Sequence, residues 1–94
     1  MDRITVRLVA RGRVQGVGYR WWARQQAHRL GLDGWVRNRL DGSVELLVAG
    51  PAAAVEQMAE ACGRGPPPAA VSAVERLSAE GEEAPPGFQE RRTL

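Results

Sequence analysis

The period of the hydrophobic pattern changes several times within 94 residues, and this alternation limits the possible folds more than any other feature. Residues 4–11 alternate apolar and polar side chains, which predicts a strand with one buried face. Residues 19–30 place apolar side chains three and four positions apart, which predicts an amphipathic helix. Gly31 follows as a suitable C-terminal cap. The first 31 residues therefore predict a strand, a loop and a helix.

The rest of the chain repeats this change of period. We predict strands at 32–39 and 43–49, separated by an Asp41-Gly42 hairpin turn, then a helix at 51–62 with Pro51 as its first residue, a strand at 71–77 and a short edge strand at 88–92. The proline-rich segment 63–68 predicts a stiff connection, and residues 80–86 predict a polar, mobile one. The resulting order is β-α-β-β-α-β.

This order is typical of an α+β, ferredoxin-like split β-α-β sandwich. We expect a four- to five-stranded antiparallel sheet with both helices on one face, in a single domain covering residues 1–94. No apolar run approaches the ~18 residues of a membrane span. The N-terminus lacks a signal-type apolar core, and a lone Cys62 cannot form an internal disulfide. We therefore expect a cytoplasmic protein without a membrane partner.

The positive charge is concentrated in the first part of the chain. Residues 1–40 hold nine arginines and two acids, whereas residues 41–94 hold four arginines and nine acids. A basic half can attract an anionic ligand, although most exposed charges only solvate a surface. The charge pattern favours an anionic partner without identifying one.

A glycine-rich loop joins the first strand to the first helix, in the run Gly12-Arg13-Val14-Gln15-Gly16-Val17-Gly18-Tyr19-Arg20. Glycines permit backbone conformations in which successive N–H groups point into one concavity. A helix N-terminus adds further unpaired donors and a partial positive charge. The guanidinium of Arg20 can hold two phosphate oxygens at once. Such a loop is either an anion site or simply a turn.

Two long motifs together carry a specific resemblance. The loop resembles the first signature of the acylphosphatase family, GxVQGVxFR, with Tyr19 in place of Phe. The run Gly31-Leu32-Asp33-Gly34-Trp35-Val36-Arg37-Asn38-Arg39-Leu40-Asp41-Gly42-Ser43-Val44-Glu45 resembles the second, GLxGWVxNxxDGxVE. The resemblance is dense over residues 4–50 and looser to Leu77, whereas residues 88–92 match the family's last strand only loosely.

The resemblance implies a metal-independent and cofactor-free hydrolase of small acyl phosphates. It implies that Arg20 binds the phosphate together with the backbone amides of the loop, which belong to Gln15, Gly16, Val17, Gly18, Tyr19 and Arg20. It also implies that Asn38 holds the attacking water. Inorganic phosphate or sulfate would then occupy the same site, and we expect a monomer. An acyl phosphate has a carboxylate leaving group, so positioning and charge stabilisation can carry most of the catalysis.

Other candidate catalytic groups have simpler explanations. His28 lies about 12 Å along the helix from Arg20 and on its polar face, which predicts a solvated histidine. Cys62 falls on the apolar face of its helix, Asp41 suits a turn, and Trp22 and Trp35 suit the core or the sheet. Trp21, on the polar side of its helix, either flanks the site or is exposed by chance.

Two functions other than catalysis remain as alternatives. An RNA-binding module of this fold class would stack bases on aromatics of the first and third strands, and residues 4–11 and 43–49 contain none. A regulatory domain could keep the anion loop and lose turnover, but both Arg20 and Asn38 are present. The family's domain also occurs at the start of larger carbamoyl-transfer maturation proteins. Because the chain ends at Leu94, we expect the free-standing enzyme.

Overall fold

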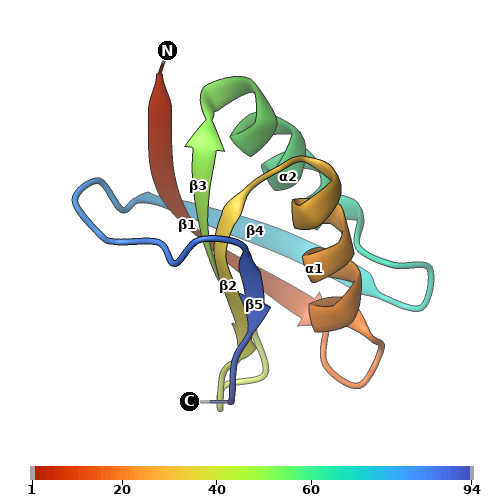
Figure 1. Cartoon of the computed structure of the whole chain (residues 1–94). Helices are drawn as coiled ribbons and strands as arrows, with labels where there is room; N and C mark the ends of the chain where they lie inside the picture. Colours follow the sequence, from red (N-terminus) through yellow and green to blue (C-terminus); the bar gives the residue numbers. More distant parts are fainter. Residues whose placement is uncertain (1, 94) are drawn as a thin grey trace.

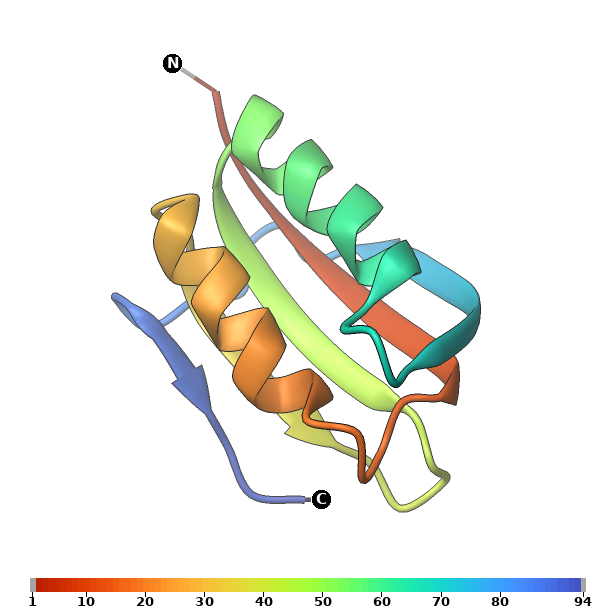
Figure 2. The same ribbon diagram turned by 90° about the vertical axis from the view of Figure 1, so that its right-hand side faces the viewer.

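Two helices pack on one face of a five-stranded sheet. The computed structural model describes residues 2–93. Its elements are β1 (Arg3–Arg13), α1 (Tyr19–Arg29), β2 (Asp33–Asn38), β3 (Val44–Pro51), α2 (Ala52–Arg64), β4 (Ala70–Ser78) and β5 (Phe88–Glu90). Both helices lie on the same face of the sheet (Figures 1 and 2). The predicted element order and the α+β, ferredoxin-like class are therefore confirmed.

The strands are arranged in the order β4-β1-β3-β2-β5. The pairs β1–β3, β1–β4 and β2–β3 are antiparallel, as expected, but β5 pairs with β2 in parallel. The expectation of a wholly antiparallel sheet was therefore wrong at the fifth strand. The connection after β4 crosses from one edge of the sheet to the other, and the N–H of Gly34 donates to Pro85 O and Gly87 O near the start of β2. The chain thus enters β5 at the same end as β2.

The bounds of α2 also differ from the sequence prediction. Pro51 was expected as the first helical residue, but it ends β3 and caps the helix with an extended backbone, at φ −57° and ψ 140°. It is also paired with Arg3 in the β1–β3 ladder. At the other end the helix continues through Arg64, two residues beyond the predicted end, and the N–H of Gly65 donates to Ala61 O. Strand pairing at one end and a continued helical hydrogen bond at the other override the local signals.

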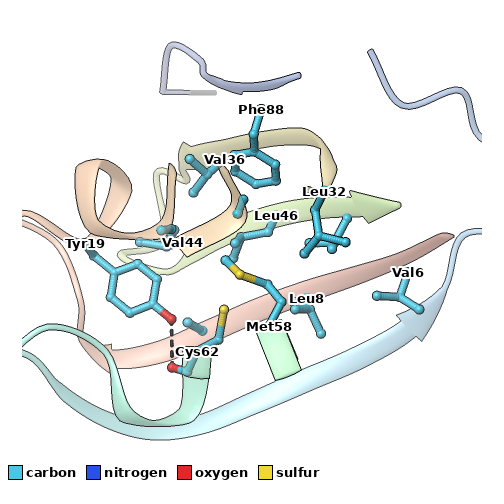
Figure 3. Close-up of a cluster of buried hydrophobic side chains, with 14 of the residues drawn as sticks. Val6, Leu8, Tyr19, Leu32, Val36, Val44, Leu46, Met58, Cys62 and Phe88 are labelled. Carbon is cyan, nitrogen blue, oxygen red and sulfur yellow. Dashed lines mark hydrogen bonds between the residues drawn. The ribbon is translucent and has the colours of Figure 1, made fainter. Parts of the chain in front are cut away.

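The main core lies between the helices and the sheet (Figure 3). Leu8 and Leu46 from the central strands pack there with Met58 of α2. The hydroxyl of Tyr19 donates to the carbonyl of Cys62 across the two helices, at 2.7 Å. Burial raises the pKa of the Cys62 thiol to about 11, so this cysteine is a neutral core residue, as predicted.

The opposite face of the sheet is covered by the chain itself. Trp35 of β2 and Leu47 of β3 pack there against Ala79. The segment 80–86, expected to be mobile, is held at several points: the carboxylate of Glu80 accepts from the N–H of Thr5, and Glu82 pairs with Arg7. Figure 1 shows this connection passing across the sheet to reach β5. Seven of the eight residues of β3 are buried as a result.

An ionic cluster completes this second face. The carboxylate of Glu45, whose residue is only 5% exposed, accepts hydrogen bonds from Arg7 and Arg37 at 2.5 and 2.9 Å. The guanidinium groups of Arg37, Arg91 and Arg7 lie 4.5, 5.3 and 5.6 Å from the ring centroid of Trp35. Burial alone would raise the pKa of Glu45, but the two arginines outweigh it and hold that pKa below its ordinary value.

Glu45→Gln is expected to lower the free energy of unfolding at pH 7 by about 2 kcal/mol, because it leaves two partly buried arginines without their shared carboxylate. Because the pKa of Glu45 is lower in the folded state, its ionised carboxylate stabilises the folded protein above the unfolded-state pKa of about 4.3. This stabilisation is lost as the pH falls through the folded-state pKa of Glu45. The variant should therefore show a flatter loss of stability below about pH 5.

Urea unfolding between pH 3 and 7 measures both effects. The matched control is Glu56→Gln, which removes another carboxylate that pairs with an arginine, Arg76, but on an exposed surface. A similar loss of stability in the two variants would contradict the role assigned to Glu45.

Candidate active site

A pocket of about 170 Å³ opens where four segments of the chain meet. It is lined by Val14, Gly16, Gly18, Tyr19, Arg20, Trp21, Asn38 and Glu90. These residues come from the β1–α1 loop, the first turn of α1, the end of β2 and the end of β5. The structure therefore brings together the two residues predicted as catalytic, Arg20 and Asn38, although they lie in different motifs.

The loop before α1 forms one side of the pocket. Gly16 and Gly18 have φ angles of 73° and 80°, in the left-handed region that other residues rarely adopt. Gly18 is the N-terminal cap of α1, and within residues 2–93 no side chain caps this helix end. Its first turn also contains no acidic residue. The helix N-terminus therefore keeps backbone donors and a partial positive charge for an external anion.

Arg20 is the cation at this end of the helix. Most ion pairs of the structure join the basic first part of the chain to the acidic second part: Arg7 pairs with Glu45 and Glu82, and Arg37 also pairs with Glu45. By contrast, Arg20 makes no ion pair with any residue from 2 to 93. Its guanidinium is therefore not neutralised by the surrounding carboxylates.

Asn38 lines the same pocket from the end of β2. Its Oδ1 is buried and accepts no hydrogen bond from the part of the chain that the structure describes. A buried acceptor without a partner is costly, and such atoms usually bind an ordered water or a ligand. Because Asn38 also lines the pocket, its side-chain amide is the uncharged polar group that the site offers for holding a water.

Gln15 and Val17 were expected to bind phosphate through their backbone amides, and neither is among the residues that line the pocket. The side chain of Gln15 donates to the carbonyls of Arg39 and Ser43, at 2.8 and 2.9 Å. It thereby ties the glycine-rich loop to the turn that follows Asn38. Figure 2 shows this loop and the β2–β3 turn lying close together below α1. Gln15 sets the relative position of the two halves of the site.

Glu90 is a pocket residue that the sequence analysis missed. Its side chain is 33% exposed, and a carboxylate oxygen lies 3.9 Å from Arg24. Parallel strands have their carboxyl ends at the same edge of a sheet, so the parallel pairing of β5 with β2 brings Glu90 near Asn38. The presence of Glu90 in the pocket follows only from the direction of β5, and residues 88–92 contain no sequence signal for that direction. Trp21, 61% exposed, also lines the pocket, which agrees with a flanking position.

The other candidates have structural roles. His28 is exposed, as expected, but its Nε2 also lies 3.1 Å from Phe88 O, in a contact between α1 and β5. Asp41 accepts hydrogen bonds from the backbone and hydroxyl of Ser43, and these bonds hold its pKa below the ordinary value. Asp41 is therefore a turn residue, as predicted.

Two further observations concern possible cofactors and membranes. Among the described residues, no three His, Cys, Asp or Glu side chains come together in a group that could hold a metal ion. Neither helix within residues 2–93 has the length and apolar character needed to cross a bilayer.

Comparison with known proteins identifies the family. The acylphosphatase family model matches residues 6–90. An acylphosphatase of Acidiphilium cryptum is 53% identical over 90 residues, covering 96% of this chain and 98% of the relative, and one of Nitrobacter hamburgensis is 59% identical over 75 residues, covering 80% and 76%. The crystal structure of acylphosphatase from Bacillus subtilis superimposes with a TM-score of 0.89 at 35% identity, covering 94% of this chain and 98% of that one. The chain belongs to the acylphosphatase family and is an enzyme that hydrolyses acyl phosphates.

Proposed function

We propose that the phosphoryl group of the substrate binds to the 15–20 loop and Arg20, and that Asn38 positions the attacking water. The observation that carries this proposal is the unpartnered, buried Oδ1 of Asn38 in the same pocket as the unpaired Arg20. The amide oxygen accepts a hydrogen bond from the water, and an amide does not titrate near neutral pH. The proposal thus assigns the water and the phosphoryl group to residues that line one pocket.

The reaction then needs no covalent enzyme intermediate. The oxygen of the water forms a bond to phosphorus, and the bond between phosphorus and the acyl oxygen breaks. The carboxylate leaves with the bonding electrons, and the proton of the water passes to a phosphate oxygen of the substrate. Arg20 and the α1 amides stabilise the charge on the phosphoryl oxygens in the transition state.

The same donors recognise a tetrahedral anion, so inorganic phosphate and sulfate are proposed as competitive ligands of the pocket. The ligands are small molecules. A role in nucleic-acid binding has little support, because β1 and β3 carry no aromatic residues and Trp35 of β2 is buried. The monomeric state and the cytoplasmic location stay predictions.

Hydrolysis of benzoyl phosphate is expected to proceed at an unchanged rate in the presence of a chelator. The physical reason is the leaving group: a carboxylate is stable as an anion, so no Lewis acid is needed to stabilise it. The measurement is the initial rate of the purified protein with and without excess chelator. Activity that disappears with chelator and returns with a divalent metal would reject the proposed mechanism. Absence of turnover in both conditions would favour an anion-binding domain without catalysis.

A further inference from the structure

Two pocket residues have no part in holding the phosphoryl group or the water. Trp21 follows Arg20 in the first turn of α1, and its indole is the largest exposed apolar side chain in the described part of the protein. Glu90 presents a carboxylate to the same pocket from the end of β5. An anionic carboxylate in a pocket for an anionic substrate opposes binding of negative charge. This conflict calls for an explanation in terms of the substrate.

The two ends of an acyl phosphate differ in chemistry. If the phosphoryl end lies against the α1 amides and Arg20, the acyl end faces the part of the pocket that these donors do not line. Val14 and Tyr19 are almost completely buried and offer little surface to a ligand, at 1% and 2% exposure. The remaining accessible side chains at the pocket are Trp21 and Glu90.

We infer that Trp21 and Glu90 form the subsite for the acyl group, and that this subsite selects uncharged, apolar acyl groups over anionic ones. The inference rests on the proposed placement of the phosphoryl group. The indole supplies a flat apolar surface on which an aromatic or branched acyl group can stack. The carboxylate of Glu90 repels an acyl group that carries its own negative charge. The residue pair thus discriminates among substrates that share the same phosphoryl end.

Arg24 moderates the charge of Glu90. The two side chains are 3.9 Å apart and are 43% and 33% exposed, so the pair is solvated and its attraction is weak. Arg24 is not among the residues that line the pocket. Glu90 therefore keeps much of its electrostatic effect on a ligand, and removal of Arg24 should increase that effect.

The test compares two substrates that differ by one charge at the acyl end, benzoyl phosphate and 4-carboxybenzoyl phosphate. The measured quantity is the ratio of their kcat/KM values at fixed ionic strength. Glu90→Gln is expected to lower this preference for benzoyl phosphate about 5-fold, whereas Arg24→Gln raises it. Trp21→Ala should reduce kcat/KM for benzoyl phosphate about 5-fold more than for acetyl phosphate, which is too small to cover an indole.

The matched control is Glu60→Gln, which removes one carboxylate from the exposed surface of α2, away from the pocket. The ratio of kcat/KM values for the two substrates in Glu60→Gln should equal that of the wild type. Normal turnover with an unchanged ratio in Glu90→Gln would overturn the inference and leave the proposed function intact. No turnover of any substrate by the wild type would reject the proposed function, and the inference with it.

Discussion

Arg20→Gln is expected to lower kcat/KM for benzoyl phosphate by about 10³-fold, the largest effect of any single substitution in this protein. Arg20 is the only cation lining the described pocket, and no carboxylate among residues 2–93 pairs with it. Its loss removes a two-pronged donor from both the bound substrate and the transition state. Steady-state kinetics should show changes in both KM and kcat.

Arg20→Lys separates charge from geometry. A lysine keeps the positive charge but cannot donate to two phosphate oxygens in a fixed plane. We expect the Kd for inorganic phosphate, measured by calorimetry, to rise about 10-fold, in line with the loss of one charge-assisted hydrogen bond. Arg13→Gln is the control, since Arg13 is exposed in the same part of the chain and does not line the pocket. Unchanged phosphate affinity in Arg20→Lys would remove Arg20 from the binding role.

Asn38→Ala is expected to lower kcat by about 10²–10³-fold and to leave KM and phosphate affinity nearly unchanged, the signature of an interaction needed mainly in the transition state. The expected loss corresponds to about 3–4 kcal/mol. The Oδ1 of Asn38 makes no hydrogen bond within the described chain, so its removal breaks no protein contact at that atom. The melting temperature should therefore stay close to that of the wild type.

A purely structural role for Asn38 predicts the reverse result. If Asn38 only supported the β2–β3 turn, Asn38→Ala would lower the melting temperature and leave kcat of the folded fraction near normal. Asp41→Ala provides the comparison, because it removes the two hydrogen bonds from Ser43 that hold this turn. We expect Asp41→Ala to reduce stability more than Asn38→Ala and to reduce kcat less. Measurement of both quantities on one preparation of each variant decides between the roles.

The parts of the fold that depend on local pattern could be predicted. The alternation in β1 and the three-and-four spacing in α1 arise from which face of each element is buried, so they are visible in the residues themselves. Element ends were less predictable. Pro51 is a strand residue and a helix cap because β1 pairs with it, and that pairing depends on a residue 48 positions earlier, Arg3.

The residues of the candidate site likewise fall into those that the sequence predicts and those that only the structure reveals. Arg20 and Asn38 lie within recognisable motifs, and the structure places both in one pocket. Glu90 lies outside those motifs and reaches the pocket only because β5 is parallel to β2. Gln15 lies inside a motif, but the contacts of its side chain with Arg39 and Ser43 involve residues more than 20 positions away. Such contacts leave no local periodicity.

By itself the sequence determined the order of the elements, the glycine-rich turn into α1 and the two polar residues of the proposed chemistry, since each depends on neighbouring residues and their backbone preferences. Only the tertiary structure decided which arginines are paired with carboxylates, which strand edge β5 joins and which side chains line the pocket. The physical reason is that ion pairs and strand partners form between residues far apart in the chain. Arg7 and Arg20 both belong to the basic first part of the chain, but Glu45 and Glu82 pair with Arg7, whereas Arg20 lines the pocket and pairs with no carboxylate among residues 2–93.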